Sequence, residues 1–445
     1  MTSGGHRVDP TRGSIRTAVR RLAIPAVSAT LLQGLFNIID MFWVGRGLGS
    51  AALAGVGTAS FVVWAILSLA EMPSVGLTAV ASRRWGEQSE AEAREAGYQA
   101  FGLAILVATA VGFSGLLFLG PMFTLMNTPL EVTLRGADYL GVYLVGCPVV
   151  FAYFAMDATF RAAGDTRTPL QILLIALAAN ALLDPLLILG VGPFPQLGTG
   201  GAALATVLTR AGSVVLGYRL LRRRNLIRRV RPSSGAMRAI ARIGFPVSAG
   251  GVTFSLIYIL LTRVTSQFGT AGLAALGVGH KIESLSFLAC IGFGVAAATA
   301  VGQNLGAGQP ERATQAGLAA LRDALVLMSL IGLAFLVIPE QLMHLFSTDS
   351  AVVAHGASYL RIVAVAQLFM AFELVLQIAM EGAGYTLWPM ASGVTLTSLR
   401  LPLAWWLHRP FGLAGVWWAI SLTAIARGVV MIGIWRHGTW RRQEV

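Results

Sequence analysis

The amino-acid sequence predicts an all-α membrane protein with twelve transmembrane helices, in two six-helix lobes related by pseudo-two-fold symmetry about the membrane normal. Three observations lead to this fold class. The chain is 56% apolar and 12% charged, with a mean hydropathy of +0.71. Apolar stretches recur along its whole length, and one half of it repeats the other. A soluble core could not bury this much apolar surface, so lipid is the solvent that fits.

Twelve apolar stretches are long enough to cross a bilayer, since a helix needs roughly 20 residues to span about 30 Å of hydrocarbon. Glycine, proline and charged residues mark their boundaries. The predicted helices are 16–46, 50–82, 92–120, 131–163, 168–190, 199–222, 238–268, 271–304, 311–338, 351–383, 386–408 and 412–436.

An internal repeat divides the chain into two halves. Three pairs of segments match at a constant offset of 220 residues: LGSAALAGVG at 48 with FGTAGLAALG at 268, GEQSEAEAREAG at 86 with GAGQPERATQAG at 306, and AGDTRTP at 163 with AGYTLWP at 383. We therefore expect an N-lobe at 1–218, an Arg-rich linker at 219–235 and a C-lobe at 236–445. Each lobe has an even number of spans, so both have the same orientation, with a cleft between them.

Basic residues are distributed as expected for a membrane protein and not for a nucleic-acid-binding protein, although the net charge is +13. Arginines gather at both termini, in the central linker and in alternate connections, whereas the other connections carry only Arg46 and Arg409. The positive-inside rule then places both termini in the cytoplasm, with the protein in the inner or plasma membrane. Cys147 and Cys290 lie in apolar runs, so we expect neither a disulfide framework nor a metal site built from cysteines. We also expect no cofactor.

Acidic residues inside the predicted helices differ between the halves. Asp40, Asp157 and Asp184 lie in the first half, while the positions 220 residues further on hold Leu260, Gln377 and Ala404. A charged side chain in the membrane costs roughly 2.5–3.5 kcal/mol on insertion scales, so each acid is a candidate functional residue.

Two of these acids have carboxamide neighbours at helical spacing. Gln33, Asn37 and Asp40 share one helix face, and Asn180 and Asp184 share another. Asp40 and Asp184 lie at similar depths, so with Asn180 they could hold Na⁺ or share a proton. The alternative is a structural hydrogen bond between helices.

Two prolines could mark moving parts of the helices that carry these acids. Pro25 and Pro185 each lack an N–H group and leave a backbone carbonyl without its helical donor. Each could be a hinge, and a static bend is the alternative.

Other intramembrane residues have less certain roles. Asp157 could be a cation ligand or an ion-pair partner of Arg161, four residues later. Candidates for lining a substrate site are Gln33, Asn37, Phe61, Trp64, Met156 and Glu283, with packing or lipid contact as the alternative for the apolar ones. No role is assigned to Glu71, Glu373 or Lys281, the only lysine in the chain.

Four segments together resemble the multidrug and toxic compound extrusion (MATE) family, in its subgroup related to the DNA-damage-inducible F protein. They are IPAVSATLLQGLFNIIDMFWVGRGLGSAALAGVG, FRAAGDTRTP, NALLDPLLILGVGPFPQLGTGGAALAT and VGQNLGAGQPERA. The resemblance covers nearly the whole chain. It implies a monomeric antiporter in the lipid bilayer that exports amphipathic, often cationic, organic compounds in exchange for H⁺ or Na⁺ by alternating access.

The resemblance also implies a cation site in the N-lobe. The matching positions are Asp40, Asn180 and Asp184, with Asp157 and Ala202 beside them. Asp157 stands where similar relatives have asparagine, and Ala202 where some have a hydroxyl residue. An extra acid favours protons, and a lost hydroxyl weakens a sodium site.

Three other classes of protein fit the sequence less well. A flippase for lipid-linked saccharides would need a more basic cleft. An intramembrane enzyme would need a catalytic signature, and neither HExxH nor GxSxG is present. A passive channel would not need a two-lobe repeat with buried acids on one side.

Overall fold

The computed structural model describes residues 7–125 and 129–444, except for the side chains of Asn37, Ser50, Leu125, Tyr258, Ile259, Thr262, Arg263, Ser266, Thr270 and Leu273. The described residues form helices and no strands, which confirms the all-α fold class. The first eight α-helices are α1 (Ile15–Gly86), α2 (Glu90–Leu117), α3 (Leu119–Leu125), α4 (Leu130–Val145), α5 (Cys147–Ala162), α6 (Arg167–Leu189), α7 (Gly198–Arg223) and α8 (Ser234–Thr265). The others are α9 (Gly269–Gly306), α10 (Pro310–Val337), α11 (Pro339–His344), α12 (Ser350–Val363), α13 (Ala366–Gly382), α14 (Leu387–Ser398), α15 (Arg400–Phe411) and α16 (Leu413–His437), with 3₁₀ turns at Ser266–Phe268 and Thr439–Arg442.

Among the described residues, nine helical stretches are long and apolar enough to cross a membrane. Two bent pairs, α4 with α5 and α12 with α13, raise this number to eleven if each pair is one span. The remaining predicted span, 386–408, coincides with α14 and α15, which are separated at Leu399. The chain is therefore a multi-pass α-helical membrane protein.

The 220-residue repeat recurs in the backbone. Gly49 and Gly269 both have left-handed dihedrals, with φ of 83° and 79°, and Gly164 and Gly384 have φ of 84° and 82°. Glycine adopts this conformation without a steric penalty, so it marks the turns at equivalent points of the two halves. The bends between α4 and α5 and between α12 and α13 are also similar, at 55° and 58°. The two halves therefore share one helical plan.

The described residues form two compact units. Residues 7–8 and 31–248 make the first unit, and residues 9–30 and 249–444 make the second. The chain passes between units three times: before α1, after Val8; inside α1, after Thr30; and inside α8, after Ser248. The lobe and linker boundaries inferred from the sequence remain a prediction.

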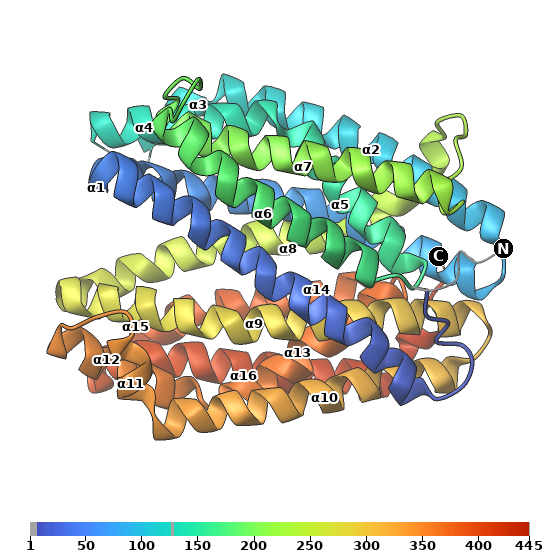
Figure 1. Cartoon of the computed structure of the whole chain (residues 1–445). Coiled ribbons are helices and arrows are strands. Elements are labelled where there is room, and N and C mark those ends of the chain that lie inside the picture. The colour runs from blue at the N-terminus through green and yellow to red at the C-terminus, as the bar shows by residue number, and fades with distance from the viewer. Residues whose placement is uncertain (1–6, 126–128, 445) are drawn as a thin grey trace. The chain divides into compact units, whose positions relative to one another are not determined.

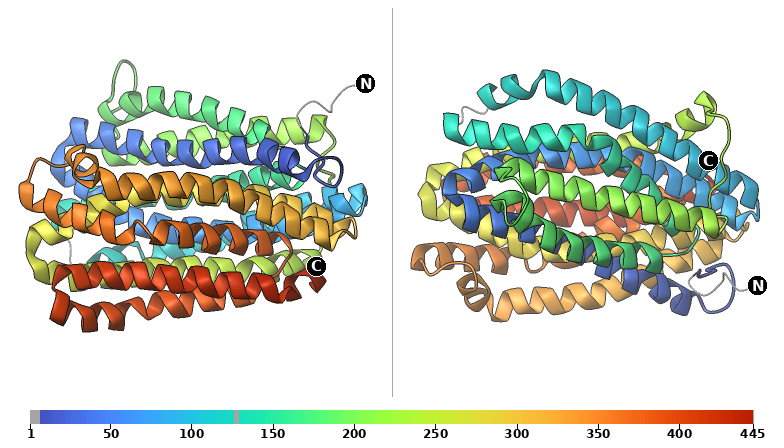
Figure 2. Two further views of the ribbon diagram at one scale, coloured as in Figure 1. Left: turned by 90° about the horizontal axis from the view of Figure 1, so that it is seen from below. Right: turned by 45° about the horizontal axis from the view of Figure 1, so that its top comes forward.

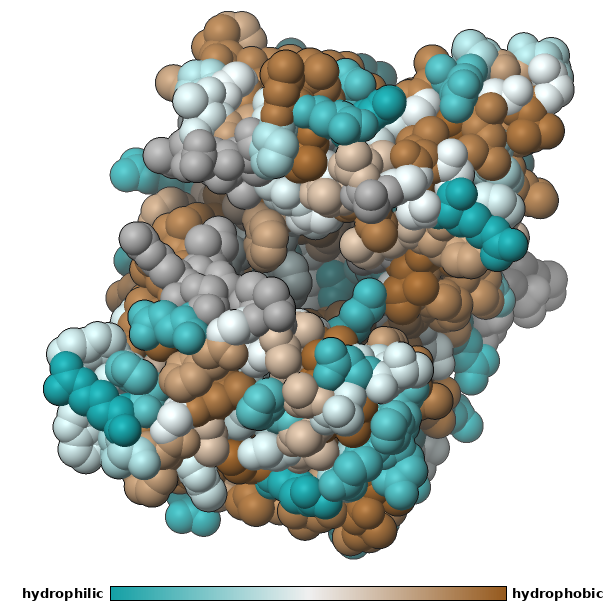
Figure 3. Space-filling view, turned by 90° about the vertical axis from the view of Figure 1, so that its left-hand side faces the viewer, coloured by the Kyte–Doolittle hydropathy of each residue, from teal (hydrophilic) through white to brown (hydrophobic). Residues whose placement is uncertain are grey.

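Within each unit the helices run roughly alongside one another (Figures 1 and 2). In the first unit α7 packs against α4, α5 and α6, while α2 packs against α5. In the second unit α13 packs against α9, α10 and α16. Large apolar side chains such as Leu106 and Phe113 on α2 remain exposed, and Figure 3 shows apolar surface beside hydrophilic residues at one end of the molecule. Exposed apolar side chains are suited to contact with lipid tails.

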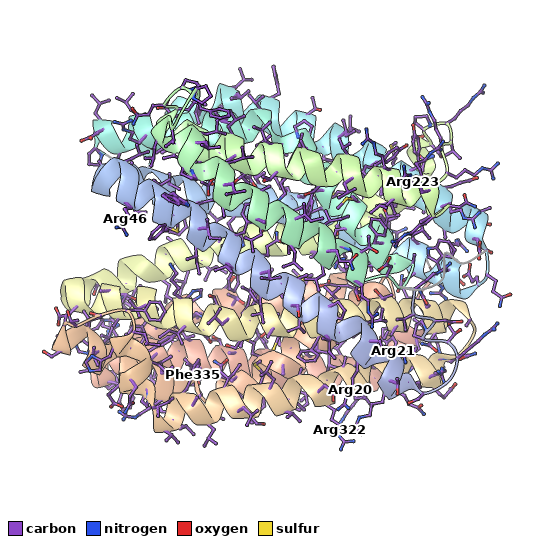
Figure 4. The ribbon with its side chains drawn as sticks, viewed as in Figure 1. Arg20, Arg21, Arg46, Arg223, Arg322 and Phe335 are labelled. Carbon is purple, nitrogen blue, oxygen red and sulfur yellow. The ribbon has the colours of Figure 1, made fainter. Side chains whose placement is uncertain are left out.

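Several arginine side chains in each unit lie near helix ends. In the first unit Arg46 and Arg223 lie toward opposite ends of the helices (Figure 4). In the second unit Arg20, Arg21 and Arg322 lie toward the same end (Figure 4), and Arg20 forms an ion pair of 2.7 Å with Asp323. Charged groups near helix ends avoid the cost of the membrane centre.

Candidate cation site

Two helices bring the predicted site residues of the first unit together. Asp40 lies on α1, and Asn180 and Asp184 lie one turn apart on α6. Asn180 Nδ2 donates hydrogen bonds to Asp40 Oδ1 at 2.6 Å and to Asp184 Oδ2 at 2.8 Å. Asp40 is 4% exposed, and the other two residues are completely buried. The structure thus joins these three residues in one buried cluster.

The Asn180 amide uses both its N–H groups for the two carboxyl groups. Its Oδ1 accepts a hydrogen bond from the Thr209 hydroxyl at 3.3 Å. In this orientation the Asn180 amide donates to both acids, and its oxygen points away from them. Na⁺ needs oxygen ligands, whereas a proton needs only the carboxyl oxygens.

The buried carboxyl groups of Asp40 and Asp184 interact electrostatically and repel each other when both are ionised. A proton on one of the two groups removes that repulsion. Among the described residues, neither acid forms a salt bridge. The pair can therefore exchange a proton without first breaking an ion pair.

Sequence analysis did not assign Thr206, Thr209 and Arg210, which complete the cluster from α7. The Thr206 hydroxyl donates to Asp40 Oδ2 at 2.9 Å. Thr206 lies one turn after Ala202, so a hydroxyl absent at the earlier position is present at the next one on the same face. In the sequence these residues could have been noticed because the apolar run ATVLTRAG contains two hydroxyl side chains and one charged side chain.

Replacing Thr206 with Val should weaken the cluster, because one buried oxygen of Asp40 loses its donor. We expect a loss of about 1–3 kcal/mol in the free energy of unfolding and a shifted pH dependence of transport. Denaturant titration of the purified protein would measure the first effect. The matched control is Thr109→Val on α2, whose exposed hydroxyl bonds only to a carbonyl of its own helix, at 2.8 Å. Equal losses in the two variants would contradict the assignment.

Asp157 has a basic partner of its own. Its carboxylate pairs with Arg161 at 2.8 Å, and Arg161 also donates to Ser74 Oγ at 3.2 Å. The ion-pair alternative is therefore present in the structure. A direct role for Asp157 in cation binding stays a prediction.

The residues predicted to line a substrate site are in different environments. Phe61 and Trp64 are about half exposed, at 49% and 48%. Met156 is completely buried, and its sulfur packs directly against Gly217, in the space that a larger residue there would need. Gln33 is partly buried, and the side chain of Asn37 lies outside the described residues. Of these, Phe61 and Trp64 have the exposure that contact with substrate requires, and the lining role stays a prediction.

The predicted hinge residues both lie inside helices. Pro185 lies inside α6, directly after Asp184. Pro25 lies in α1, where Gly49 is the one described position that departs from helical dihedrals. The hinge role of each proline stays a prediction.

The second unit also has acids inside its helices, with a different arrangement. Glu283, on α9, accepts hydrogen bonds from the hydroxyl of Tyr359 and from Gln367 Nε2. Glu373 pairs with Arg427 at 2.8 Å, and both side chains are largely buried. Both units pair an acid with arginine, Asp157 in the first and Glu373 in the second. What distinguishes the first unit is that one amide, Asn180, bridges two of its buried acids, Asp40 and Asp184.

The apolar helices, the internal repeat and a buried pair of acids define a multi-pass α-helical membrane transporter. A model of the MatE family matches residues 25–186 and 246–406, once in each half. The chain belongs to the MatE family, as the sequence motifs predicted. Because members of this family are transporters, the chain is not an enzyme.

Curated relatives cover almost the whole chain. The probable multidrug resistance protein NorM of Thermotoga maritima is 29% identical over 97% of this chain and 94% of its own. The FAD transporter of Shewanella oneidensis is 28% identical over 88% of each. These proteins are similar to this chain in sequence throughout both halves.

Two solved structures share the fold over 100% of both chains at 23% identity. One is a MOP superfamily transporter from Pyrococcus furiosus, with a TM-score of 0.91. The other is an outward-facing multidrug resistance MATE family transporter, with a TM-score of 0.90. At this identity the likeness establishes the fold alone, which is that of a twelve-helix transporter.

Proposed function

We propose that this transporter exports amphipathic organic cations in exchange for protons, by alternating access in the cell membrane with both termini in the cytoplasm. The observation that carries the proposal is the buried cluster in which Asn180 bridges Asp40 and Asp184. The names of relatives similar over nearly the whole chain, which include multidrug resistance proteins, support the substrate class.

In this proposal the cluster binds a proton and attracts a cationic substrate in turn. Two adjacent carboxyl groups hold one proton readily, because a proton removes the repulsion between two buried negative charges. When the proton leaves, the cluster gains a negative charge that attracts a cationic substrate. Coupling follows when proton and substrate each favour a different conformation of the same protein.

Helix α1 is a moving part in this proposal because it belongs to both compact units. The division falls after Thr30, five residues beyond Pro25. In α8 the division after Ser248 falls two residues beyond Pro246. The chain also crosses between units before α1, after Val8, but these two are the helices that a movement between units would have to bend, and proline weakens the helix at each place.

Replacing Pro25 with Ala should slow transport several-fold while leaving substrate binding intact. Alanine restores the N–H donor and stiffens α1 near the division. The transport rate in proteoliposomes and the substrate Kd in detergent would separate the two effects. Ile24→Ala, at an exposed neighbour of Pro25, is the matched control. An unchanged rate in Pro25→Ala would remove the hinge role.

The experiment that tests the proposed function is dye efflux from proteoliposomes with pH and sodium gradients imposed separately. A pH gradient should drive ethidium transport, and a sodium gradient at equal pH should not. Transport driven by a sodium gradient alone would mean that the coupling ion is Na⁺ and not H⁺. Transport that neither gradient drives would refute antiport.

A further inference from the structure

Segment 219–242 carries most of the excess positive charge of the chain. It runs from the end of α7 to the start of α8 and contains nine arginines and no aspartate or glutamate, whereas the net charge of the whole chain is +13. Two of the nine pair with acids elsewhere in the first unit, Arg224 with Asp165 at 2.7 Å and Arg228 with Glu95 at 3.6 Å. The other seven are exposed and form no salt bridge within the described part of the chain. They are Arg219, Arg222, Arg223, Arg229, Arg231, Arg238 and Arg242.

The backbone of this segment is held against the first unit. Gln99 on α2 clamps it, because Nε2 donates to the carbonyl of Arg231 at 2.8 Å and Oε1 accepts from the N–H of Ser233 at 3.0 Å. Leu226 is buried in the apolar core of the same unit. The arginines are therefore presented from a fixed backbone near the helix ends, where Figure 4 places Arg223.

Some of these arginines lie side by side on one helix. Arg219 and Arg222 are three residues apart on α7, and Arg238 and Arg242 are four residues apart on α8. Like charges at these spacings repel each other. An anionic group between two such arginines removes the repulsion and accepts charge-assisted hydrogen bonds from both guanidinium groups. The arginine pairs are thus suited to bind phosphate.

The connection between α1 and α2 balances its charge differently. Residues 83–95 contain three arginines and four glutamates. Arg83 and Arg84 both pair with Glu87, at 3.7 and 2.6 Å. Segment 219–242 has no acid of its own, so the counter-charge for its seven exposed arginines has to come from outside the chain.

Exposed apolar side chains continue the helix faces on which these arginines lie. On α7, Leu208 and Val215 precede Arg219 by eleven and four residues, and they are 47% and 51% exposed. On α8, Phe245 follows Arg242 by three residues and is 64% exposed. Residues at these spacings share one face of a helix. Each row therefore joins apolar surface, suited to acyl chains, to a charged end suited to headgroups.

We propose that the arginines of segment 219–242 bind the phosphate groups of anionic phospholipids, whose acyl chains lie along the exposed apolar rows of α7 and α8. A soluble anion would use the arginines and leave the apolar rows without a partner, so the two features together favour a lipid. This binding surface is separate from the Asp40–Asp184 cluster, and the proposal does not depend on the transported substrate or the coupling ion.

The test combines Arg219→Gln, Arg222→Gln, Arg238→Gln and Arg242→Gln in one variant of the full chain. Thermal unfolding is followed in mixed micelles of dodecyl maltoside with phosphatidylglycerol or phosphatidylcholine. Phosphatidylglycerol should raise the unfolding temperature of the wild type above its value in phosphatidylcholine, because a ligand of the folded state stabilises it. Each arginine near an anionic surface strengthens binding about fivefold, so a site that loses two should bind the lipid roughly twenty-five-fold more weakly. The phosphatidylglycerol fraction that gives half the rise in the wild type should then give almost none in the variant.

The matched control removes the same charge from the second unit by replacing four exposed arginines with Gln. They are Arg16, Arg322, Arg436 and Arg442. This control variant should keep the full response to phosphatidylglycerol. Equal losses in the two variants would overturn the proposal, because total charge would then explain the response. Equal effects of the two lipids on the wild type would also overturn it, as would a rise of the same size with inorganic phosphate, which would indicate a site for a soluble anion.

Cross-linking of the wild type tests the location even if the quadruple variant does not fold. Phosphatidylglycerol and phosphatidylcholine analogues with a photoreactive diazirine in the acyl chain are incorporated into vesicles that contain the protein, and labelled peptides are identified by mass spectrometry. The anionic analogue should label residues 208–245 several-fold more than the neutral one does. Around Leu106 and Phe113, which are exposed apolar residues on α2, the two analogues should label equally. Equal labelling of residues 208–245 by both analogues would overturn the proposal.

Discussion

Replacing Asp40 with Asn is expected to abolish transport driven by a pH gradient while leaving the protein folded. Asn180 and Thr206 donate to different oxygens of Asp40. Asparagine keeps one oxygen to accept from Asn180, and its NH₂ group can donate to the Thr206 hydroxyl, but it cannot release a proton at any working pH. Ethidium efflux from proteoliposomes under an imposed pH gradient should fall to the level of protein-free vesicles.

The control for this variant is Asp138→Asn, at an exposed position on α4. It should transport at the wild-type rate, and both variants should elute as wild type does on size exclusion. Undiminished pH-driven efflux by Asp40→Asn would mean that the coupling proton binds elsewhere.

Replacing Arg427 with Met should cause the largest loss of stability. Arg427 neutralises Glu373 at 2.8 Å, and the Glu373 side chain is 5% exposed. Removing one partner of a buried ion pair leaves an uncompensated charge, which costs about 3–5 kcal/mol. Unfolding of the purified protein in a mixed-micelle denaturant titration would measure this loss.

A double variant separates lost charge balance from lost packing. Glu373→Gln with Arg427→Met removes both charges and should recover most of the stability. Arg436→Met, at an exposed site on the same helix, should change stability little. If the double variant is as unstable as Arg427→Met, the pair does not stabilise the protein through its charges.

The fold was largely predictable because helix length and apolar composition are local properties of the sequence. The sequence predicts one continuous helix for each of the spans 131–163 and 351–383, whereas both spans are bent in the structure. Pro148, in the first turn of α5, lacks a donor and gives a sequence signal for the first bend. Neither proline nor glycine lies at the second bend, between Val363 and Ala366, so hydropathy alone could not locate it.

The candidate site was predictable in part. Asp40, Asn180 and Asp184 stand out because acids in apolar helices are costly, and helical spacing pairs two of them. Thr206 and Arg210 were not assigned because the hydrogen bond from Thr206 to Asp40 and the electrostatic effect of Arg210 on Asp40 depend on how α7 packs against α1. The Thr206 contact joins residues 166 positions apart in the chain. A single sequence does not contain that information.

The most direct test of proton exchange at this site is the release of protons when substrate binds. Ethidium is added to the detergent-purified protein in weakly buffered solution, and a pH indicator counts the protons released per substrate bound. The wild type should release one proton near neutral pH, and Asp40→Asn should release none. Substrate binding by the wild type without proton release would contradict the account.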